Sequence, residues 1–230
     1  MLNKIIFFSI WLGLIAYAFF LSPPDDPETI DLIINLSTSK WDGINPYIIC
    51  LFNIMGVLPF IYASFLIIDG KGQKIMASPF VLGSFFLGAF SLLPYFALRE
   101  ENTEFTGEKT KIISILDSRF FAILITLVSI TLVTIAVMKG DWQDFVQQWQ
   151  TSKFIHIMSL DFCCLCLLFP TIVRDDIKKR NLPESNIFLL LSFIPLLGTL
   201  IYLCFRPQLP ENNQDNFNGE YRIPNTEKVS

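Results

Sequence analysis

The chain has 230 residues, of which 52% are hydrophobic and only 17% are charged, and its formal net charge is −4. A soluble domain of this size cannot bury so much apolar surface, so the composition indicates that the lipid bilayer is part of the solvent. The 17 lysines and arginines form no basic patch, which excludes nucleic acid as a partner.

Six apolar segments are long enough to cross a bilayer, because a spanning helix needs about 20 residues. They cover residues 2–21, 44–68, 79–98, 120–138, 154–173 and 187–205. The sequence therefore predicts an all-α polytopic membrane protein with about six transmembrane helices. Residues 1–206 would form a single six-span membrane domain without an internal repeat, and the polar tail 207–230 would be disordered. The first segment is predicted to be an uncleaved anchor, because its apolar run continues through Phe19–Leu21.

Two shorter helices are predicted between these segments. The run Trp142–Trp149 places aromatic residues on one helical face and glutamines on the other, with Asp141 as the N-cap. This pattern is typical of an amphipathic helix that lies in the membrane interface. Ile30–Leu36 is too short to span and is predicted to lie at the interface or on the bundle.

With six spans, the lysines and arginines divide almost equally between the two sides of the membrane. Residues close to the span ends carry most weight. They favour a cytoplasmic loop at residues 174–180, with both termini on the opposite side.

The fifth apolar segment contains His156, which is the only histidine of the chain, and Asp161. Ionisable residues inside a span are candidate functional groups, here as an acid and a base. They lie about 140° apart around a helix, so a direct pair is not expected. Asn53, Tyr62 or Tyr95 could supply a partner for either residue. The alternative is that Asp161 is a structural residue that ties helices together.

A charged run follows the same segment and is a candidate surface for docking a membrane partner or a lipid headgroup. It consists of Arg174, Asp175, Asp176, Lys178, Lys179 and Arg180. The alternative is a solvated loop that sets topology. The five cysteines lie inside apolar runs, and the spacing of Cys163, Cys164 and Cys166 does not fit a zinc site. We therefore expect neither a metal nor a cofactor.

The segments Ile44–Glu100, Ser152–Phe162 and Phe193–Pro207 resemble a family of uncharacterised polytopic membrane proteins of cyanobacteria and plastids. This resemblance implies a photosynthetic organism. It also implies a cyanobacterial thylakoid or plasma membrane, or a plastid membrane in a eukaryote.

Residues Ser152–Pro207 also carry a histidine, an Asp-Phe pair and a final glycine-containing segment that ends in Tyr-Leu-x-x-Arg. They are similar to the plant membrane proteins required for neoxanthin formation. The matching residues are His156, Asp161, Phe162, Gly198, Tyr202 and Arg206, whereas Thr199 stands where that family tends to have proline. This likeness implies a carotenoid-like substrate.

Three functions are compatible with these patterns. The preferred prediction is an accessory or assembly protein of a photosynthetic membrane, which acts through contacts with lipids and with a photosynthetic complex. The first alternative is a membrane enzyme for a carotenoid-like substrate, with Asp161 and His156 as acid and base. The second is a small proton-coupled transporter. Because no catalytic set is complete and few polar groups lie within the spans, the first is favoured.

Overall fold

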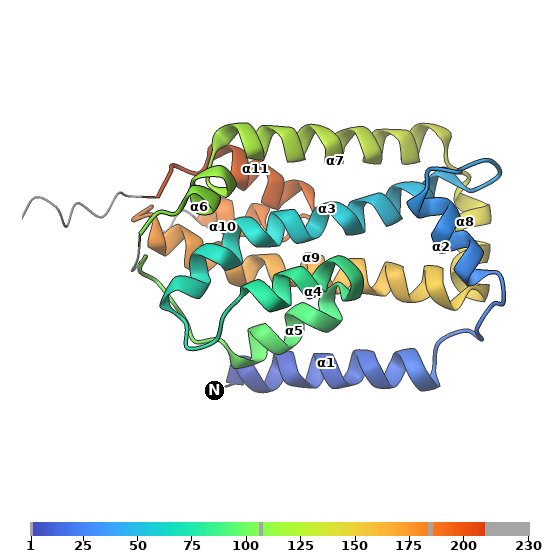
Figure 1. The fold of residues 1–230 in the computed structure, drawn as a ribbon, viewed down its shortest axis with the longest axis horizontal. Coiled ribbons are helices and arrows are strands. Elements are labelled where there is room, and N and C mark those ends of the chain that lie inside the picture. The colour runs from blue at the N-terminus through green and yellow to red at the C-terminus, as the bar shows by residue number, and fades with distance from the viewer. Residues whose placement is uncertain (1, 106–107, 184–185, 210–230) are drawn as a thin grey trace, which may run out of the picture.

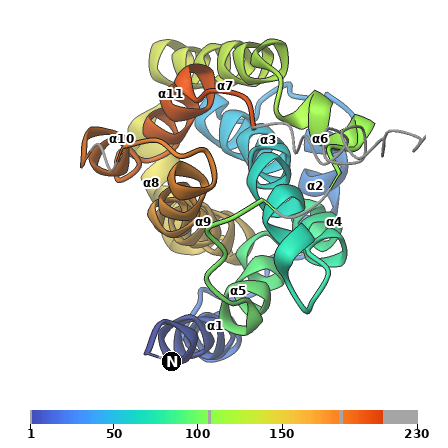
Figure 2. The same cartoon turned by 90° about the vertical axis from the view of Figure 1, so that its left-hand side faces the viewer.

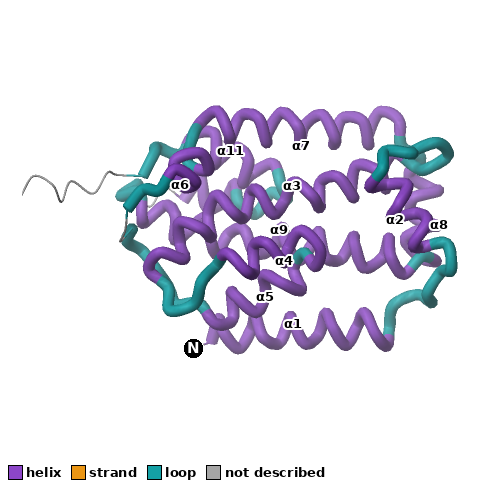
Figure 3. The backbone as a smooth tube through the Cα atoms, in the orientation of Figure 1, coloured by secondary structure: helices purple, strands orange, loops and turns teal. Residues whose placement is uncertain are grey.

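The computed structural model describes residues 2–105, 108–183 and 186–209, and the predicted tail lies outside this range from residue 210 onward. In these residues all regular structure is helical (Figures 1 and 3). The first half of the chain forms α1 (Leu2–Phe20), α2 (Thr29–Ser37), α3 (Pro46–Asp69), the 3₁₀ turn η1 (Gly70–Gly72), α4 (Ser78–Leu87) and α5 (Ala89–Leu98). The second half forms α6 (Lys111–Leu116), α7 (Arg119–Lys139), α8 (Trp142–Thr151), α9 (Lys153–Lys179), α10 (Asn186–Leu191) and α11 (Leu197–Phe205).

Four helices, α1, α3, α7 and α9, are long and apolar enough to cross a membrane. They run side by side in alternating directions along the long axis of the molecule (Figure 1). The prediction of an all-α membrane protein is thereby confirmed. The predicted helix at residues 142–149 is present as α8, and Asp141 caps it by accepting hydrogen bonds from the amides of Gln143 and Asp144.

The predicted span at residues 79–98 is not one helix. It consists of two ten-residue helices, α4 and α5, and each is about 15 Å long, half of what a bilayer requires. Gly88 breaks the segment with a backbone φ of 49°, which favours glycine. The two helices fold back on each other, and the Ser91 hydroxyl of α5 donates a 2.8 Å hydrogen bond to the Phe80 carbonyl of α4. This antiparallel pair, residues 78–98, is the first hairpin.

The predicted span at residues 187–205 is also divided, into α10 and α11 of six and nine residues. The chain turns at Leu196, where φ is 59°. The two arms approach so closely that a Cβ on Gly198 would lie 1.6 Å from the carbonyl oxygen of Leu191. Residues 186–205 form the second hairpin. Where the sequence predicted six spanning helices, the structure has four long helices and two hairpins.

Both hairpins begin and end at the same end of the bundle. Arg99, just after α5, lies 3.0 Å from the carboxylate of Asp69 at the end of α3. Arg206, just after α11, lies 3.2 Å from the carboxylate of Asp176 near the end of α9. We call this the charged end, and it includes the start of α1 (Figure 1). The opposite end carries α2 and α8 and is called the α2–α8 end.

The part of the chain that the structure describes contains two copies of one structural unit. In each half a long helix is followed by a short helix at the α2–α8 end, a second long helix and a hairpin. The view along the bundle shows α3 and α9 at the centre (Figure 2). Around them α1 lies opposite α7, α4 opposite α10, and α5 opposite α11. The halves are therefore related by an approximate two-fold axis that runs along the bundle.

The same three side chains close the hairpin in both halves. The Tyr95 hydroxyl donates to Asp69, 26 residues before it, and the guanidinium of Arg99 binds the same carboxylate, 30 residues away. In the second half Tyr202 and Arg206 bind Asp176 across the same two separations of 26 and 30 residues. This repeat corrects the expectation of a chain without internal repetition. Few other positions are identical between the halves, so simple inspection of the sequence does not show it.

Candidate functional site

Asp161 binds the tip of the first hairpin. Its Oδ1 accepts a 2.6 Å hydrogen bond from the backbone amide of Ala89, the first residue of α5. The first amides of a helix have no partner within the helix, and a carboxylate there is favoured by the helix dipole. The close approach requires glycine at position 88, because a Cβ on Gly88 would lie 1.9 Å from Asp161 Oδ2. Asp161 thus joins α9 to the first hairpin.

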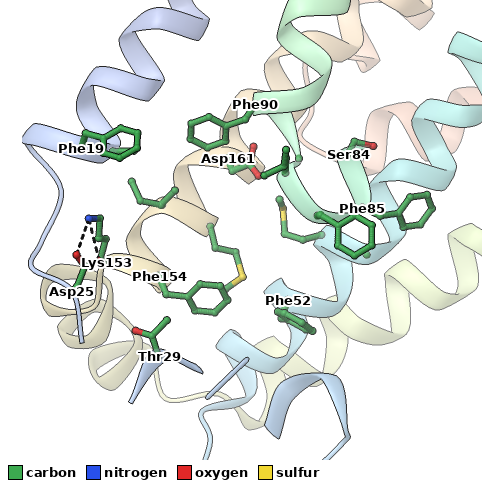
Figure 4. Close-up of a pocket in the computed structure, with 18 residues that line it drawn as sticks. Phe19, Asp25, Thr29, Phe52, Ser84, Phe85, Phe90, Lys153, Phe154 and Asp161 are labelled. Carbon is green, nitrogen blue, oxygen red and sulfur yellow. Dashed lines mark hydrogen bonds and ion pairs between the residues drawn. The ribbon is translucent and has the colours of Figure 1, made fainter. Parts of the chain in front are cut away.

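A cavity of about 690 Å³ lies beyond this tip, between the first hairpin, α3, α9 and the end of α1 (Figure 4). The hairpin reaches only about half-way along the bundle, so it does not fill the space nearer the α2–α8 end. The wall is mainly apolar and aromatic. Its aromatic residues are Phe19, Phe52, Phe85, Phe86, Phe90 and Phe154.

The polar groups of this cavity lie at two levels. Asp161 borders it at the hairpin tip, beside Phe90 (Figure 4). Lys153 and Asp25 form an ion pair of 3.1 Å near the start of α9 and line the cavity on the side of the α2–α8 end. A molecule in the cavity would thus meet a carboxylate at its inner end, an apolar middle and a charged pair at the outer level.

One oxygen of Asp161 is free to act on a ligand. Oδ1 is bound by Ala89, whereas no described residue donates a hydrogen bond to Oδ2. Among the residues that the structure describes, the other buried carboxylates, Asp69, Asp117, Asp175 and Asp176, all take part in ion pairs. Asp161 is therefore the buried carboxylate with spare capacity to accept a hydrogen bond.

The repeat shows which polar residues the scaffold itself requires. The offset that relates Asp69 to Asp176 also relates Ile54 to Asp161 and Ile49 to His156. The hairpin-binding aspartates, Asp69 and Asp176, thus occur in both halves, while the carboxylate at the hairpin tip has an isoleucine as its counterpart. Because the same unit forms with isoleucine at this position, Asp161 is an addition of the second half to a common scaffold.

His156 lies apart from the cavity lining. Its Nδ1 is 2.9 Å from the carbonyl oxygen of Trp149, and its Nε2 is 2.9 Å from the hydroxyl of Tyr17. A carbonyl only accepts, so we assign the proton to Nδ1, and in neutral histidine Nε2 then accepts from Tyr17. The ring also stacks on Trp149 at 4.4 Å. His156 therefore ties α1 to the junction of α8 and α9.

The residues expected as partners for His156 and Asp161 bind elsewhere. Asn53 donates to the carbonyl of Ile49, the Tyr62 hydroxyl donates to the carbonyl of Leu165, and Tyr95 donates to Asp69. The structure thus brings together Asp161 and Ala89, a backbone partner that a search for polar side chains misses. The signal for this contact is Gly88 in the middle of an apolar segment.

Most of the predicted docking residues are interior. Asp175, Asp176, Lys179 and Arg180 are buried, whereas Arg174 is exposed and Lys178 partly exposed. The buried ones belong to a group of four aspartates and four cations, called the charge cluster. Its members are Asp69, Arg99, Asp117, Asp175, Asp176, Lys179, Arg180 and Arg206.

Ion pairs run through the whole charge cluster. Lys179 lies 2.6 Å from Asp69, and Arg180 lies 2.8 Å from Asp176 and 2.7 Å from Asp117. Burial opposes the charged form of Arg99, yet the carboxylates of Asp69 and Asp175 raise its pKa above the ordinary value. The cluster is therefore a set of compensated charges that holds the ends of α3, α5, α9 and α11 together.

The cysteines of α9 do not gather into a ligand set. Cys163 is exposed and Cys166 is buried, so the two thiols have different surroundings. Within residues 2–105, 108–183 and 186–209, no group of three or more histidine, cysteine or acidic side chains is arranged to hold a metal ion.

Comparison of the chain with protein-family models, with curated proteins and with solved structures finds no match. The cavity, its free carboxylate oxygen and the two-fold repeat are therefore the observations from which a function is inferred.

Proposed function

We propose that this integral membrane protein binds an amphiphilic ligand of the bilayer in the cavity beyond the tip of the first hairpin. The ligand has a long apolar body and one polar group that donates a hydrogen bond, such as a hydroxyl or an amine. The observation that carries the proposal is the free Oδ2 of Asp161 at the inner end of an apolar cavity.

The dimensions and chemistry of the cavity support this class of ligand. Its volume of about 690 Å³ is in the range of small-molecule sites, about 300–1,000 Å³. Such sites combine an apolar wall with few polar groups that fix orientation. Aromatic side chains would pack against the ligand body, and Asp161 would bind its polar group because no protein donor occupies Oδ2. The outer Lys153–Asp25 pair would lie next to the opposite end of the ligand.

A four-span topology accompanies this proposal. The helices α1, α3, α7 and α9 cross the bilayer, both hairpins enter it from the charged end and leave on the same side, and α2 and α8 lie in the opposite interface. Irregular backbone at membrane depth is tolerated where protein buries it or where it lines a cavity. The tip of the first hairpin meets this condition, because Asp161 binds its free amide.

The distribution of basic residues supports an orientation with the charged end in the cytoplasm. Three basic residues belong to the α2–α8 end, namely Lys40, Lys139 and Lys153. Twelve belong to the charged end, namely Lys4, Lys71, Lys74, Arg99, Lys109, Lys111, Arg119, Arg174, Lys178, Lys179, Arg180 and Arg206. The near-equal division predicted from sequence arose from counting each hairpin as a span. The start of α1 is therefore proposed to be cytoplasmic together with residues 174–180.

Filling the cavity tests ligand binding directly. Gly56 of α3 lines the cavity, and no atom lies within 4 Å of a Cβ built on it. The variant Gly56→Phe should therefore fold and occupy the ligand space. Gly13→Phe on α1 is the matched control, because its Cβ is equally unobstructed and it does not line the cavity.

The measurement is mass spectrometry of an organic extract of protein purified in mild detergent. We expect an apolar compound that co-purifies with the wild type and with Gly13→Phe and is largely lost from Gly56→Phe. Indistinguishable extracts from all three proteins would contradict the proposal.

Variants of Asp161 test its role as the acceptor. Asp161→Asn keeps an oxygen that accepts from Ala89 but removes the negative charge, whereas Asp161→Leu removes both acceptors. We expect Asp161→Leu to retain less of the compound than Asp161→Asn, and Ile54→Leu, at the equivalent position of the other half, to behave as wild type. Equal retention in Asp161→Leu and wild type would exclude Asp161 as the ligand-binding group.

Cysteine labelling in intact cells tests the topology. Single cysteines at Lys71 and Lys178 should both be protected from a membrane-impermeant maleimide until the membrane is opened, and cysteines at Lys40 and Gln147 should react at once. The wild type provides the background of the native cysteines. Opposite accessibility of the cysteines at Lys71 and Lys178 would refute the four-span arrangement.

The functions predicted from sequence stay predictions. They are an accessory protein of a photosynthetic membrane, an enzyme for a carotenoid-like substrate, and a proton-coupled transporter. A carotenoid belongs to the same broad class of apolar ligands, so identification of the extracted compound also tests that alternative. Fractionation of the membranes tests the predicted thylakoid or plasma-membrane location.

A further inference from the structure

A second cavity, of about 370 Å³, lies at the charged end. It is bordered by the start of α1, the end of α5, the last third of α9, and α10 with the turn that follows it. Its apolar wall is formed by Phe7, Phe96, Pro170, Leu189 and Phe193. It is separate from the cavity of Asp161, with which it shares no lining residue.

The carboxylates around the second cavity are already paired. Glu100 lies 3.3 Å from Lys74, Glu101 lies 2.8 Å from Lys178, and Asp175 binds Arg99. They contribute little net negative charge to the cavity, since each has a cation beside it.

Two lining cations, Lys4 and Arg174, form no ion pair with a described residue. Nζ of Lys4 donates a 3.4 Å hydrogen bond to the carbonyl of Leu98, and within the described parts of the chain it pairs with no carboxylate. Arg174 is exposed and makes no hydrogen bond or ion pair with any described residue. The cavity thus presents two unpaired positive charges above an apolar wall.

The two-fold repeat separates Arg174 from the scaffold. The offset that relates Asp69 to Asp176 relates Ile67 to Arg174, so the other half of the protein has an apolar residue at this position. The scaffold therefore forms without a cation here. As with Asp161, the polar residue is an addition to one half.

We propose that this second cavity binds the phosphodiester headgroup of an anionic glycerophospholipid. Arg174 presents a planar guanidinium that suits bidentate binding of phosphate oxygens, and Lys4 adds a point charge from α1. The beginning of an acyl chain lies against Phe7 and Phe193. Cations at this level of a membrane protein are placed where anionic headgroups occur, and basic pockets between helices bind them. The site is independent of the ligand proposed for the Asp161 cavity.

Titration of the detergent-solubilised full chain with phosphatidylglycerol, followed by native mass spectrometry, tests this site. The variants are Lys4→Gln, Arg174→Gln and their combination. We expect each lost cation to reduce the affinity of the first bound lipid about fivefold, which is typical of one basic residue at an anionic surface. Arg174→Lys should lose less lipid affinity than Arg174→Gln because it keeps the positive charge.

Two controls make the outcome decisive. Lys71→Gln and Lys111→Gln remove charges from the same end of the molecule but do not line the cavity, and they should bind phosphatidylglycerol as the wild type does. Phosphatidylcholine should bind more weakly and respond to none of the substitutions.

Unchanged lipid binding in the double variant, with an unchanged melting temperature, would overturn the proposal. If the double variant does not fold, Arg174→Lys is compared with Arg174→Gln instead. Equal lipid affinities of these two variants would overturn the proposal. Displacement of the lipid by millimolar inorganic phosphate would also overturn it, because the site would then hold free phosphate rather than a lipid.

Discussion

The rings of Tyr62 and Phe169 stack at the centre of the bundle, with 4.8 Å between their centroids and 14° between their planes. The two residues occupy equivalent positions, since each precedes the hairpin-binding aspartate of its half, Asp69 or Asp176, by two helical turns. The stack therefore lies at the approximate two-fold axis and joins α3 to α9. The two structural units meet through a pair of nearly identical side chains.

We expect this stack to dominate the contact between the halves. Phe169 is fully buried, so Phe169→Ala should lower the free energy of unfolding by about 3–5 kcal/mol. Tyr62→Phe keeps the stack but loses the hydrogen bond to Leu165, which is worth about 1 kcal/mol. Thermal unfolding in detergent, followed by tryptophan fluorescence, measures both. A larger loss of unfolding free energy in Tyr62→Phe than in Phe169→Ala would contradict the expectation that the stack dominates.

Loss of either hairpin-binding aspartate should strongly destabilise the protein. Asp69→Asn leaves the buried Lys179 without a carboxylate and leaves Arg99 with Asp175 alone. Asp176→Asn leaves Arg180 and Arg206 to share Asp117 as their remaining carboxylate. Breaking a buried pair in this way costs about 3–5 kcal/mol. Both variants should lower the melting temperature by similar amounts, because the two aspartates have equivalent roles.

Glu100→Gln is the control for these two variants. Its ion pair with Lys74 is 61% and 86% exposed at the two side chains, so its removal should cost about 0–1 kcal/mol. If Asp69→Asn were as mild as Glu100→Gln, the charge cluster would not hold the hairpins.

Gly88→Ala should destabilise the tip of the first hairpin for two reasons. A residue with a Cβ resists the positive φ by about 1–2 kcal/mol, and the new methyl group would collide with Asp161. The double variant Gly88→Ala, Asp161→Ala should recover the stability that is lost through the collision, but not the stability that is lost through the positive φ. Gly13→Ala, where nothing lies within 4 Å, should leave the melting temperature unchanged or slightly higher. Equal melting temperatures for Gly88→Ala and Gly13→Ala would contradict this view of the tip.

Tyr17→Phe should weaken the attachment of α1 at the α2–α8 end. It removes the hydrogen bond to His156, worth about 1 kcal/mol, and preserves the ring. Tyr47→Phe is a matched control, since the Tyr47 hydroxyl makes no hydrogen bond with the described residues. Limited proteolysis near residues 22–28 measures the attachment, and faster cleavage is expected only for Tyr17→Phe. Identical cleavage of the two variants would show that the bond to His156 does not hold α1.

Hydropathy located every apolar segment but could not distinguish a crossing helix from a hairpin. Residues 44–68 and 79–98 are equally apolar, and the difference lies in one backbone angle at Gly88 and in the contact between Gly83 and Ser91. Composition does not encode such angles. Small residues on both sides of a central glycine are the available signal, and they also fit ordinary helix packing.

The charge cluster was hidden for a different reason. Asp69, Arg99 and Asp176 each lie in a loop-like stretch when the sequence is considered alone, and only the fold shows that they share an interior. The spacing from Asp69 to Tyr95 and Arg99, repeated from Asp176 to Tyr202 and Arg206, was present in the sequence. This spacing becomes meaningful only when the residues between the aspartate and the arginine are known to form a hairpin that returns to the charged end of the bundle.

The depth of the first hairpin has an electrical consequence. Its tip lies about 15 Å from the charged end, roughly half of the ~30 Å hydrocarbon thickness. In an energised bilayer of the proposed topology, a charged group that reaches Asp161 from the α2–α8 end crosses about half of the transmembrane potential. Occupancy of this carboxylate by a cationic ligand would then change by about 1 kcal/mol for each 100 mV. A change of 100 mV in membrane voltage would therefore alter the affinity of the cavity for such a ligand about fivefold, without any movement of the hairpin.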